Sequence, residues 1–150
     1  MNLKRKIKNS INAIINYSFI ILVVLTSTQL NAQVVSTLAG SGSSGSNNAT
    51  GTSASFSKPQ GLVVDANGNI YVSEYSGHKI RKITPDGVVT TFAGSSSGNN
   101  NGTGTSARFN RPNGLAIDGS GNIYVADEWN HRIRKITTAG VVTTLAGSSS

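Results

Sequence analysis

Two histidines, His78 and His131, are the side chains of this chain best suited to metal binding or proton transfer. They lie 53 residues apart, at the same position of an internal repeat. Repeat symmetry places them in successive structural units, so we expect them not to converge on one ion. The glycine-rich stretches lack the lysine and helix start of a phosphate-binding loop, and the serines fall mostly in low-complexity segments. The sequence therefore predicts no catalytic residue, no metal site and no cofactor.

Basic residues gather in two matching segments of the repeat. They supply six of the nine cations that follow residue 32, at Lys79, Arg81, Lys82, Arg132, Arg134 and Lys135. One interpretation is a solvated outer strand whose charges oppose edge-to-edge pairing. The alternative is a repeated positive stripe that binds an acidic partner such as an anionic polysaccharide. The candidate ligand-binding residues of this stripe are Lys79, Arg81, Arg132 and Arg134.

The turn before each basic segment is where the two copies differ most, with Glu-Tyr-Ser-Gly from residue 74 and Asp-Glu-Trp-Asn from residue 127. An exposed turn that varies freely would explain the difference. Alternatively, side chains of this turn bind a ligand, and the candidates are then Tyr75, Glu128 and Trp129. We expect Glu74 and Asp127, which end the preceding strand, to accept hydrogen bonds from backbone N–H groups of the same turn.

The repeat defines the elements that must position these residues. Residues 56–94 and 109–147 are identical at 23 of 39 positions without a gap, and residues 34–40 match the end of the unit. Each copy contains four short runs rich in Val, Ile, Thr and Tyr, as half-buried strands require. The predicted strands are 61–65, 69–74, 79–84 and 88–93 in the first copy and 114–118, 122–127, 132–137 and 141–146 in the second.

Turn chemistry separates these runs. Asn67-Gly68 is a strong hairpin signal between the first two strands, because both residues tolerate positive φ. The turn between the third and fourth strands reads Pro85-Asp86-Gly87 in the first copy and Thr138-Ala139-Gly140 in the second. Only the glycine is common to both, so we infer that the backbone conformation of this turn requires it. We therefore expect scaffold roles for Gly68, Gly121, Gly87 and Gly140. Asp65 and Asp118 are explained by a hairpin start. A four-stranded antiparallel unit repeated in tandem is typical of a propeller blade.

The motif PxGLxxDxxGNIYVAD followed by NHRIRKI in the second copy resembles the NHL repeat, and the resemblance extends over both copies. It implies an all-β fold of propeller blades at 61–94 and 114–147, with His78 and His131 as structural hydrogen-bonding residues. Propellers of this family serve as protein-, RNA- or ligand-binding modules, whereas a related lyase is an enzyme. The chain departs from the family in having two copies, where about six blades close a ring.

The repeat is also longer than the roughly 40–45 residues usual for a blade. The excess lies in the Gly/Ser/Asn-rich connections 41–60 and 95–113, which we expect at the surface because their lengths differ by one residue. In a four-stranded meander these connections emerge on the same side as the turns 74–77 and 127–130. We therefore place the long connections and the variable turns on one face.

The predicted core comprises apolar residues of the first three strands of each copy, because both faces of a blade pack on its neighbours. They are Leu62, Val64, Ile70, Val72, Ile80 and Ile83, with Leu115, Ile117, Ile123, Val125, Ile133 and Ile136. With two blades, one face of each stays bare, and that apolar area should cause self-association.

The first 32 residues have the order of a secretory signal: a basic start, an apolar run over 13–25, and a polar stretch ending at Ala32. A membrane anchor is the alternative, but the apolar run is shorter than the roughly 20 residues that cross a bilayer. Residues 4–8 hold four cations, so removal of the signal reduces the net charge from +7 to +3 and the basic character no longer suggests nucleic-acid binding. The chain has no cysteine. We expect a secreted or periplasmic product without stable membrane insertion.

The segments before the first copy and after the second indicate how the propeller continues beyond these two blades. Residues 33–40 are predicted to form an orphan fourth strand that closes a ring, and 148–150 resemble the start of another connection. We therefore expect further blades downstream.

These features favour a non-catalytic binding or adhesion scaffold for protein or polysaccharide. The alternative is part of a propeller enzyme, similar to a lactone hydrolase or a lyase, with a metal in its central channel. The first strands line that channel with 62–64 and 115–117, which offer no metal ligand. A purely structural spacer is a third possibility.

Overall fold

The computed structural model describes residues 34–147, so the predicted signal (1–32) and residues 148–150 lie outside the described residues. Contacts divide the chain into Met1–Val35 and a compact unit that starts at Ser36. Among the described residues no helix is long and apolar enough to cross a membrane.

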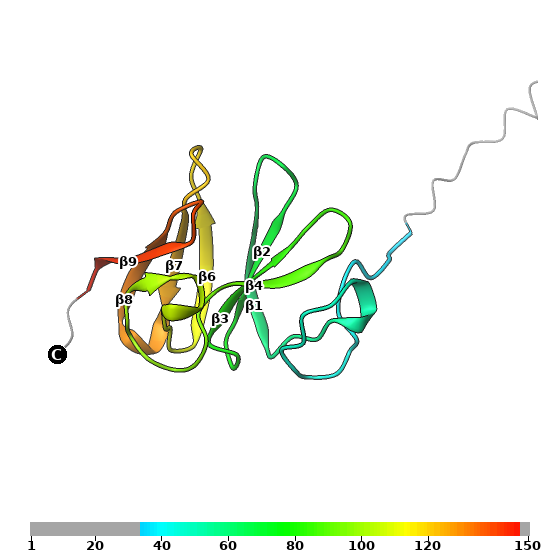
Figure 1. Cartoon of the computed structure of the whole chain (residues 1–150), viewed down its shortest axis with the longest axis horizontal. Coiled ribbons are helices and arrows are strands. Elements are labelled where there is room, and N and C mark those ends of the chain that lie inside the picture. Colours follow the sequence, from blue (N-terminus) through cyan, green and yellow to red (C-terminus); the bar gives the residue numbers. More distant parts are fainter. Residues whose placement is uncertain (1–33, 148–150) are drawn as a thin grey trace, which may run out of the picture. The chain divides into compact units, whose positions relative to one another are not determined.

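Two antiparallel sheets make up the compact unit, and each contains one copy of the repeat (Figure 1). The first sheet, blade 1, has the order β1-β2-β3-β4, and the second, blade 2, has the order β5-β9-β8-β7-β6. The strands are β1 Pro59–Val64, β2 Ile70–Glu74, β3 Lys79–Ile83, β4 Val89–Ala93, β5 Gly102–Thr103, β6 Pro112–Ile117, β7 Ile123–Asp127, β8 Arg132–Ile136 and β9 Val141–Ala146. Eight of these are the predicted strands, with ends within two residues, and the all-β fold is confirmed. The helices are single 3₁₀ turns at η1 Gly51–Ser53, η2 Gly104–Ser106 and η3 Glu128–Asn130.

The hairpins follow the predicted turn chemistry. Gly68 and Gly121 have φ of 79° and 81°, and Gly87 and Gly140 have φ of 79° and 78°, where a side chain would be strained. Asp118 starts the β6–β7 hairpin: its Oδ1 accepts from the backbone N–H of Asn122 at 2.9 Å and its Oδ2 from the hydroxyl of Tyr124 at 3.0 Å. Asp65 makes equivalent bonds in blade 1. The roles predicted for these residues are confirmed.

The long connections are ordered edge segments, which corrects the expectation of irregular surface loops on one face. β5 pairs antiparallel with β9, and a bridge between Thr50 and Val88 repeats this contact in blade 1. The N–H of Gly104 then donates to the carbonyl of Gly140 in the β8–β9 turn, on the opposite side from the β7–β8 turn. Each connection therefore runs along the whole outer edge of the blade that follows it. An exposed edge strand needs such cover because its backbone groups are otherwise unpaired.

β1 and β6 lie side by side and form the junction between the blades. A Cβ atom added to Gly61 would lie 2.6 Å from the carbonyl oxygen of Asn113, so only glycine permits this approach of two backbones. The hydroxyl of Ser73 donates to that same carbonyl and accepts from the N–H of Gly61 at 2.9 Å. The junction is therefore a close backbone contact with one bridging hydroxyl.

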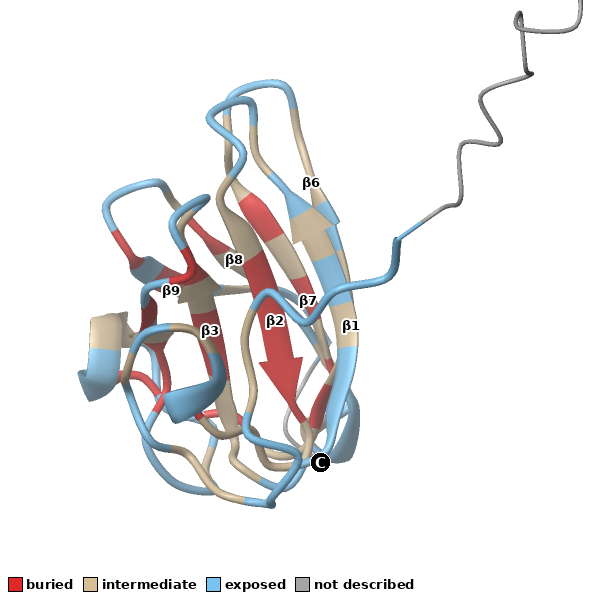
Figure 2. Ribbon diagram, turned by 90° about the vertical axis from the view of Figure 1, so that its right-hand side faces the viewer, coloured by how far each residue is buried: buried red, intermediate tan, exposed pale blue. Residues whose placement is uncertain are grey.

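The core differs from its prediction at the two ends of the unit. Val72, Ile80, Ile83, Ile123, Val125 and Ile136 are buried as expected, and Ile70, Leu115 and Ile117 are partly buried. Leu62 (64% exposed), Val64 (51%) and Ile133 (42%) are exposed, which corrects their assignment to the core. Their sides of the blades have no neighbouring blade within residues 34–147, and Figure 2 shows β1 largely exposed beside the buried β2. Residues of the connections were missed: Ala54, Ala107 and Phe109 are fully buried.

The predicted strand over 33–40 does not form in its described part. Residues 34–40 contain no strand, and Val34 and Val35 are 85% and 94% exposed. The ring-closing role of this segment stays a prediction.

Candidate functional site

Each blade buries one arginine of its basic strand in an ion pair. Arg134 Nη1 lies 2.8 Å from Asp127 Oδ2, and Arg81 Nη1 lies 2.8 Å from Glu74 Oε1, with all four side chains fully buried. Each guanidinium also stacks on a phenylalanine, 5.3 Å from the ring centroids of Phe109 and Phe56 respectively. Arg81 and Arg134 were candidates for ligand binding, and the structure corrects this because neither can reach a partner.

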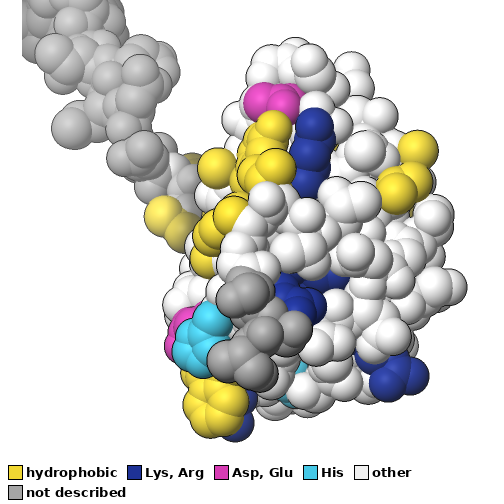
Figure 3. All heavy atoms as spheres, turned by 90° about the vertical axis from the view of Figure 1, so that its left-hand side faces the viewer, with side chains coloured by type: hydrophobic (Ala, Val, Ile, Leu, Met, Phe, Trp, Pro, Cys, Tyr) yellow, Lys and Arg dark blue, Asp and Glu magenta, His cyan; other side chains and the backbone are white. Residues whose placement is uncertain are grey.

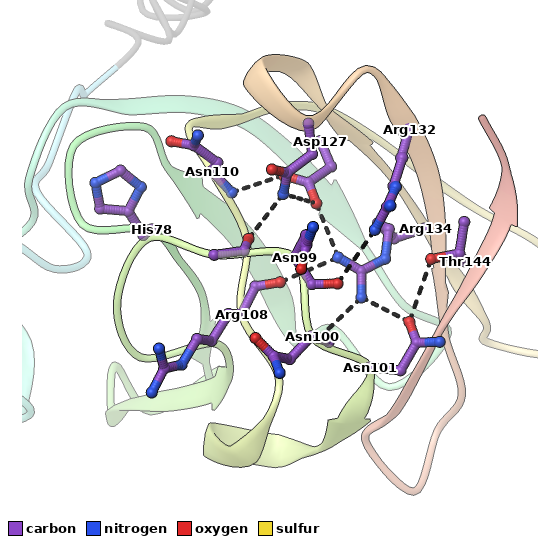
Figure 4. Close-up of polar contacts among 12 residues, drawn as sticks. His78, Asn99, Asn100, Asn101, Arg108, Asn110, Asp127, Arg132, Arg134 and Thr144 are labelled. Carbon is purple, nitrogen blue, oxygen red and sulfur yellow. Dashed lines mark hydrogen bonds and ion pairs between the residues drawn. The ribbon is translucent and has the colours of Figure 1, made fainter. Parts of the chain in front are cut away.

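The asparagine-rich connections supply the remaining acceptors of these arginines, and Figure 4 shows those of Arg134. Arg134 Nη2 donates to the carbonyl of Asn100 and to Oδ1 of Asn101, at 3.0 and 2.8 Å, and its Nη1 donates to the carbonyl of Arg108. Asn47, Asn48 and Ser55 do the same for Arg81. A buried charge is tolerable only when paired and hydrogen-bonded, so the low-complexity connections carry a specific structural function.

The acids of the pairs hold the connections in place. Asp127 Oδ1 accepts from the backbone N–H of Asn110 at 2.7 Å, and Glu74 Oε1 accepts from that of Ser57 at 3.1 Å. We expected these acids to accept backbone N–H groups of their own turns. The groups instead belong to the ends of the long connections, which pass beside the turns.

The other basic residues of these strands do not form a continuous positive stripe. Lys79 and Arg132 are half-buried, and Arg132 Nη1 donates to the carbonyl of Asn99 at 3.3 Å. Lys82 and Lys135 lie 5.9 Å from the ring centroids of Tyr71 and Tyr124. Because successive side chains of a strand point to opposite faces, the arginine of each basic strand is buried on one face. The lysine that follows it is half-buried on the other face, where it covers a tyrosine ring.

An arginine that the sequence prediction missed organises the variable turns. The guanidinium carbon of Arg111 lies 3.5 Å from the ring centroid of Trp129 and 5.4 Å from that of Tyr75. Tyr75 belongs to blade 1 and Trp129 to blade 2, so the cation bridges the junction. We call Tyr75, Arg111 and Trp129 the arginine–aromatic cluster. The signal that could have revealed it is a basic residue before Pro in both copies, Lys58 and Arg111.

Backbone geometry fixes this arginine. Arg111 has a left-handed φ of 55°, and its N–H donates to Nδ1 of His78 at 3.2 Å. Desolvation, with the positive charge of Arg111 next in importance, lowers the pKa of His78, which keeps Nδ1 free to accept. The structural hydrogen-bonding role predicted for His78 is confirmed.

The remaining candidates lie around the cluster. Trp129 is 51% exposed, and Glu128 Oε2 accepts from Nδ2 of Asn113 at 2.8 Å on the same side of blade 2. The structure thus brings Tyr75 and Trp129 together at Arg111, whereas the side chain of Glu128 binds Asn113. Over residues 34–147, no group of three or more His, Asp or Glu side chains could hold a metal ion.

Comparison with known proteins identifies the repeat. The family model of the NHL repeat matches residues 56–83 and 109–136. The chain carries two NHL repeats. The NHL repeat-containing protein 2 of Gallus gallus is 38% identical over 92 residues, which are 59% of this chain and 12% of that protein. The chain therefore spans about an eighth of that relative.

Solved structures share the blade architecture of these NHL repeats. A structural genomics protein of unknown function from Bacteroides thetaiotaomicron is 31% identical, with a TM-score of 0.61 over 79% of this chain and 29% of its own. An auxiliary nutrient binding protein from Bacteroides ovatus is 29% identical, with a TM-score of 0.57 over 69% of this chain and 27% of its own. Propeller-type NHL blades are thus the fold of this chain.

Proposed function

We propose that the chain acts as an exported, non-catalytic binding module whose arginine–aromatic cluster binds an acidic polysaccharide. The observation that carries the proposal is the guanidinium of Arg111, held 3.5 Å from the ring centroid of a half-exposed tryptophan. A guanidinium presents paired N–H donors that match a carboxylate. Aromatic rings beside it offer flat apolar surface to the C–H faces of a sugar ring.

The cluster is built before any ligand arrives. Its arginine is anchored by the bond from its backbone to His78 and by the rings of Tyr75 and Trp129. Ordering a free arginine side chain on binding costs conformational entropy, and a preorganised one avoids most of that cost. The similarity to an auxiliary nutrient binding protein supports a binding role at the level of the fold.

Export is the second part of the proposal, and it rests on the signal-like order of residues 1–32. A polysaccharide partner is compatible with a secreted or periplasmic protein. The enzyme alternative would need a metal site elsewhere, and metal analysis of the purified protein tests it.

Affinity electrophoresis against polygalacturonate, with neutral dextran as reference, tests the binding function. We expect Arg111→Gln and Trp129→Ala each to weaken binding about tenfold, since a charge-assisted or stacking contact contributes on the order of 1–3 kcal/mol. Lys135→Gln removes the same charge outside the cluster and should change little. Equal losses for Arg111→Gln and Lys135→Gln, or equal binding to dextran, would refute a specific site.

A further inference from the structure

Three asparagines of the chain are followed by glycine, at Asn67-Gly68, Asn101-Gly102 and Asn113-Gly114. An asparagine in this context can lose its side-chain amide, because the backbone nitrogen of the next residue attacks the side-chain carbonyl carbon. Glycine has no Cβ, so it leaves that nitrogen unhindered and the backbone free to adopt the required conformation. All three pairs consist of the same two residues, so differences in their reactivity have to come from the structure around them.

The pair at Asn67 is the least restrained of the three. Asn67 and Gly68 are exposed at the tip of the β1–β2 hairpin, a loop that projects beyond its strands in Figure 1. Within residues 34–147 the side chain of Asn67 makes no hydrogen bond, and its backbone N–H donates to Oδ1 of Asp65 at 2.9 Å. The N–H of Gly68 donates to the carbonyl of Asp65 at 3.0 Å, and this turn bond can open without separating β1 from β2. The amide of Asn67 can therefore approach the nitrogen of Gly68.

Asn101 is held by the buried arginine of blade 2. Its Oδ1 accepts from Arg134 Nη2 at 2.8 Å and from the hydroxyl of Thr144 at 3.3 Å. Gly102 is paired with Val142 in the ladder between β5 and β9, so the attacking nitrogen is fixed as well. Cyclisation would turn the amide away from the guanidinium and leave a buried donor without its acceptor, which is costly. The structure therefore protects Asn101.

Asn113 is fixed through both its side chain and its backbone. Its Nδ2 donates to Glu128 Oε2 at 2.8 Å. Its carbonyl oxygen accepts from the hydroxyl of Ser73 and lies against Gly61, where an added Cβ would be 2.6 Å away. The peptide bond that joins Asn113 to Gly114 thus belongs to the close contact between the blades, and the rotation that cyclisation needs would disturb that contact.

We propose that Asn67 is a site of spontaneous deamidation, whereas the fold protects Asn101 and Asn113. The nitrogen of Gly68 forms a bond to Cγ of Asn67, the bond from Cγ to Nδ2 breaks, and ammonia leaves with the proton of the Gly68 N–H. Water then opens the cyclic imide at either of its two carbonyls and leaves aspartate or isoaspartate at position 67. Water is the only other reactant, and the inference is independent of the polysaccharide site.

The modification would act on blade 1 alone. Isoaspartate passes the chain through the side chain and so adds one carbon to a turn that is closed by its bonds to Asp65. The Oδ2 atom of Asp65 accepts from the hydroxyl of Tyr71 at 3.3 Å. The ring of Tyr71 packs on Phe92, with 4.9 Å between the centroids, in the core where the blades meet. Blade 2 has Ser120 where blade 1 has Asn67, so its hairpin cannot undergo this reaction.

Incubation of the full chain in mildly alkaline buffer, folded and in denaturant, tests the proposal by mass spectrometry of its peptides. In the folded protein we expect Asn67 to react at least about tenfold faster than Asn101 and Asn113, because bonds that must open reduce the reactive population. In denaturant the three rates should become similar. The chain has 6 acidic and 13 basic residues, and Figure 3 shows few acidic side chains on its face. Ion exchange should therefore separate the form with one added carboxylate.

The second copy of the repeat supplies the matched control. Asn67→Ser gives the tip of blade 1 the Ser-Gly pair of blade 2, whose hairpin has the same turn bonds around Asp118. This variant should fold like the parent and yield none of the added-carboxylate form. Equal rates at the three asparagines of the folded protein, or a faster reaction at Asn101 or Asn113, would overturn the proposal. So would rates that stay equally different in denaturant, or an added-carboxylate form that persists in Asn67→Ser.

Discussion

Blade 1 and blade 2 bury an equivalent arginine, but they surround it with two different pairs of residues. Blade 1 pairs its buried arginine with Glu74 and has glycine at position 77, where an added Cβ would lie 2.4 Å from Glu74 Oε2. Blade 2 uses the shorter Asp127 and has Asn130 at the equivalent position. Asn130 Nδ2 donates to Asp127 Oδ2 at 2.8 Å and to the carbonyl of Gly98 at 2.7 Å.

Packing therefore constrains which residues the two variable turns can contain. Asp127 is one methylene shorter than Glu74, and the amide of Asn130 compensates by donating to the Asp127 carboxylate. In blade 1 the hydroxyl of Ser46 donates to Glu74 Oε2 at 3.2 Å instead. The acid and the residue three positions later therefore change together, and the sequence difference at this turn is partly compensation.

The largest effect should come from removing a buried arginine. Arg134→Met leaves Asp127 buried without its partner, so we expect a loss of about 3–5 kcal/mol in the free energy of unfolding. Arg81→Met should behave alike if the two blades are equivalent. Denaturant unfolding measures both, with Lys135→Met as a control expected within about 0.5 kcal/mol of the parent. A loss below 1 kcal/mol for either arginine would contradict the role assigned to the pair.

Exchanging the turn residues tests the compensation directly. Gly77→Asn in the presence of Glu74 forces an overpacked site and should cost about 1–3 kcal/mol. Glu74→Asp combined with Gly77→Asn recreates the pair of blade 2 and should recover most of that loss. Denaturant midpoints of the two single variants and the double variant give the coupling energy. Simple additivity would show that the two residues are independent.

The smallest effect concerns the hairpin aspartates. The side chain of Asn122, with further hydrogen bonds, lowers the pKa of Asp118 from 3.8 to about 2. At Asp65 burial opposes the shift, but hydrogen bonds with Asn69 still lower the pKa. A lowered pKa means that the contribution to stability is complete above the unfolded value near 3.8 and disappears as the pH falls towards 2.

We therefore expect the unfolding free energy to decrease between pH 4 and 2 in the parent. The decrease should be smaller in Asp118→Asn, which cannot titrate there. NMR titration of the Asp118 carboxyl gives its pKa directly. A value at or above 3.8 would contradict the hydrogen-bonded hairpin.

Sequence patterns predicted the strands well because most of them are local runs rich in Val, Ile, Thr and Tyr, and the hairpin turns between them contain glycine. They could not predict β5, since Gly102–Thr103 has no strand signal and forms only where the edge of β9 requires a partner. The burial of Arg81 was also hidden. It lies opposite Val72 in the sheet, and its burial depends on Glu74 and on asparagines more than 30 residues away.

The candidate binding site was predicted in part. Tyr75, Glu128 and Trp129 were named from differences between the copies, and their role in binding stays a prediction. Arg111 was missed because its place between two rings depends on the contact of two blades. A left-handed backbone at a basic residue cannot be recognised from composition.

The position of β5 and the asparagine pair has a consequence for how such proteins evolve. Blade 2 obtains its edge strand and the acceptors for Arg134 from residues 95–113, which directly precede it in the chain. A duplicated stretch of 53 residues therefore brings with it the acid and the oxygen acceptors that bind its buried arginine. Recombination between repeats can add or remove blades without leaving an unpaired cation in the interior, and only the flat contacts between blades have to remain compatible.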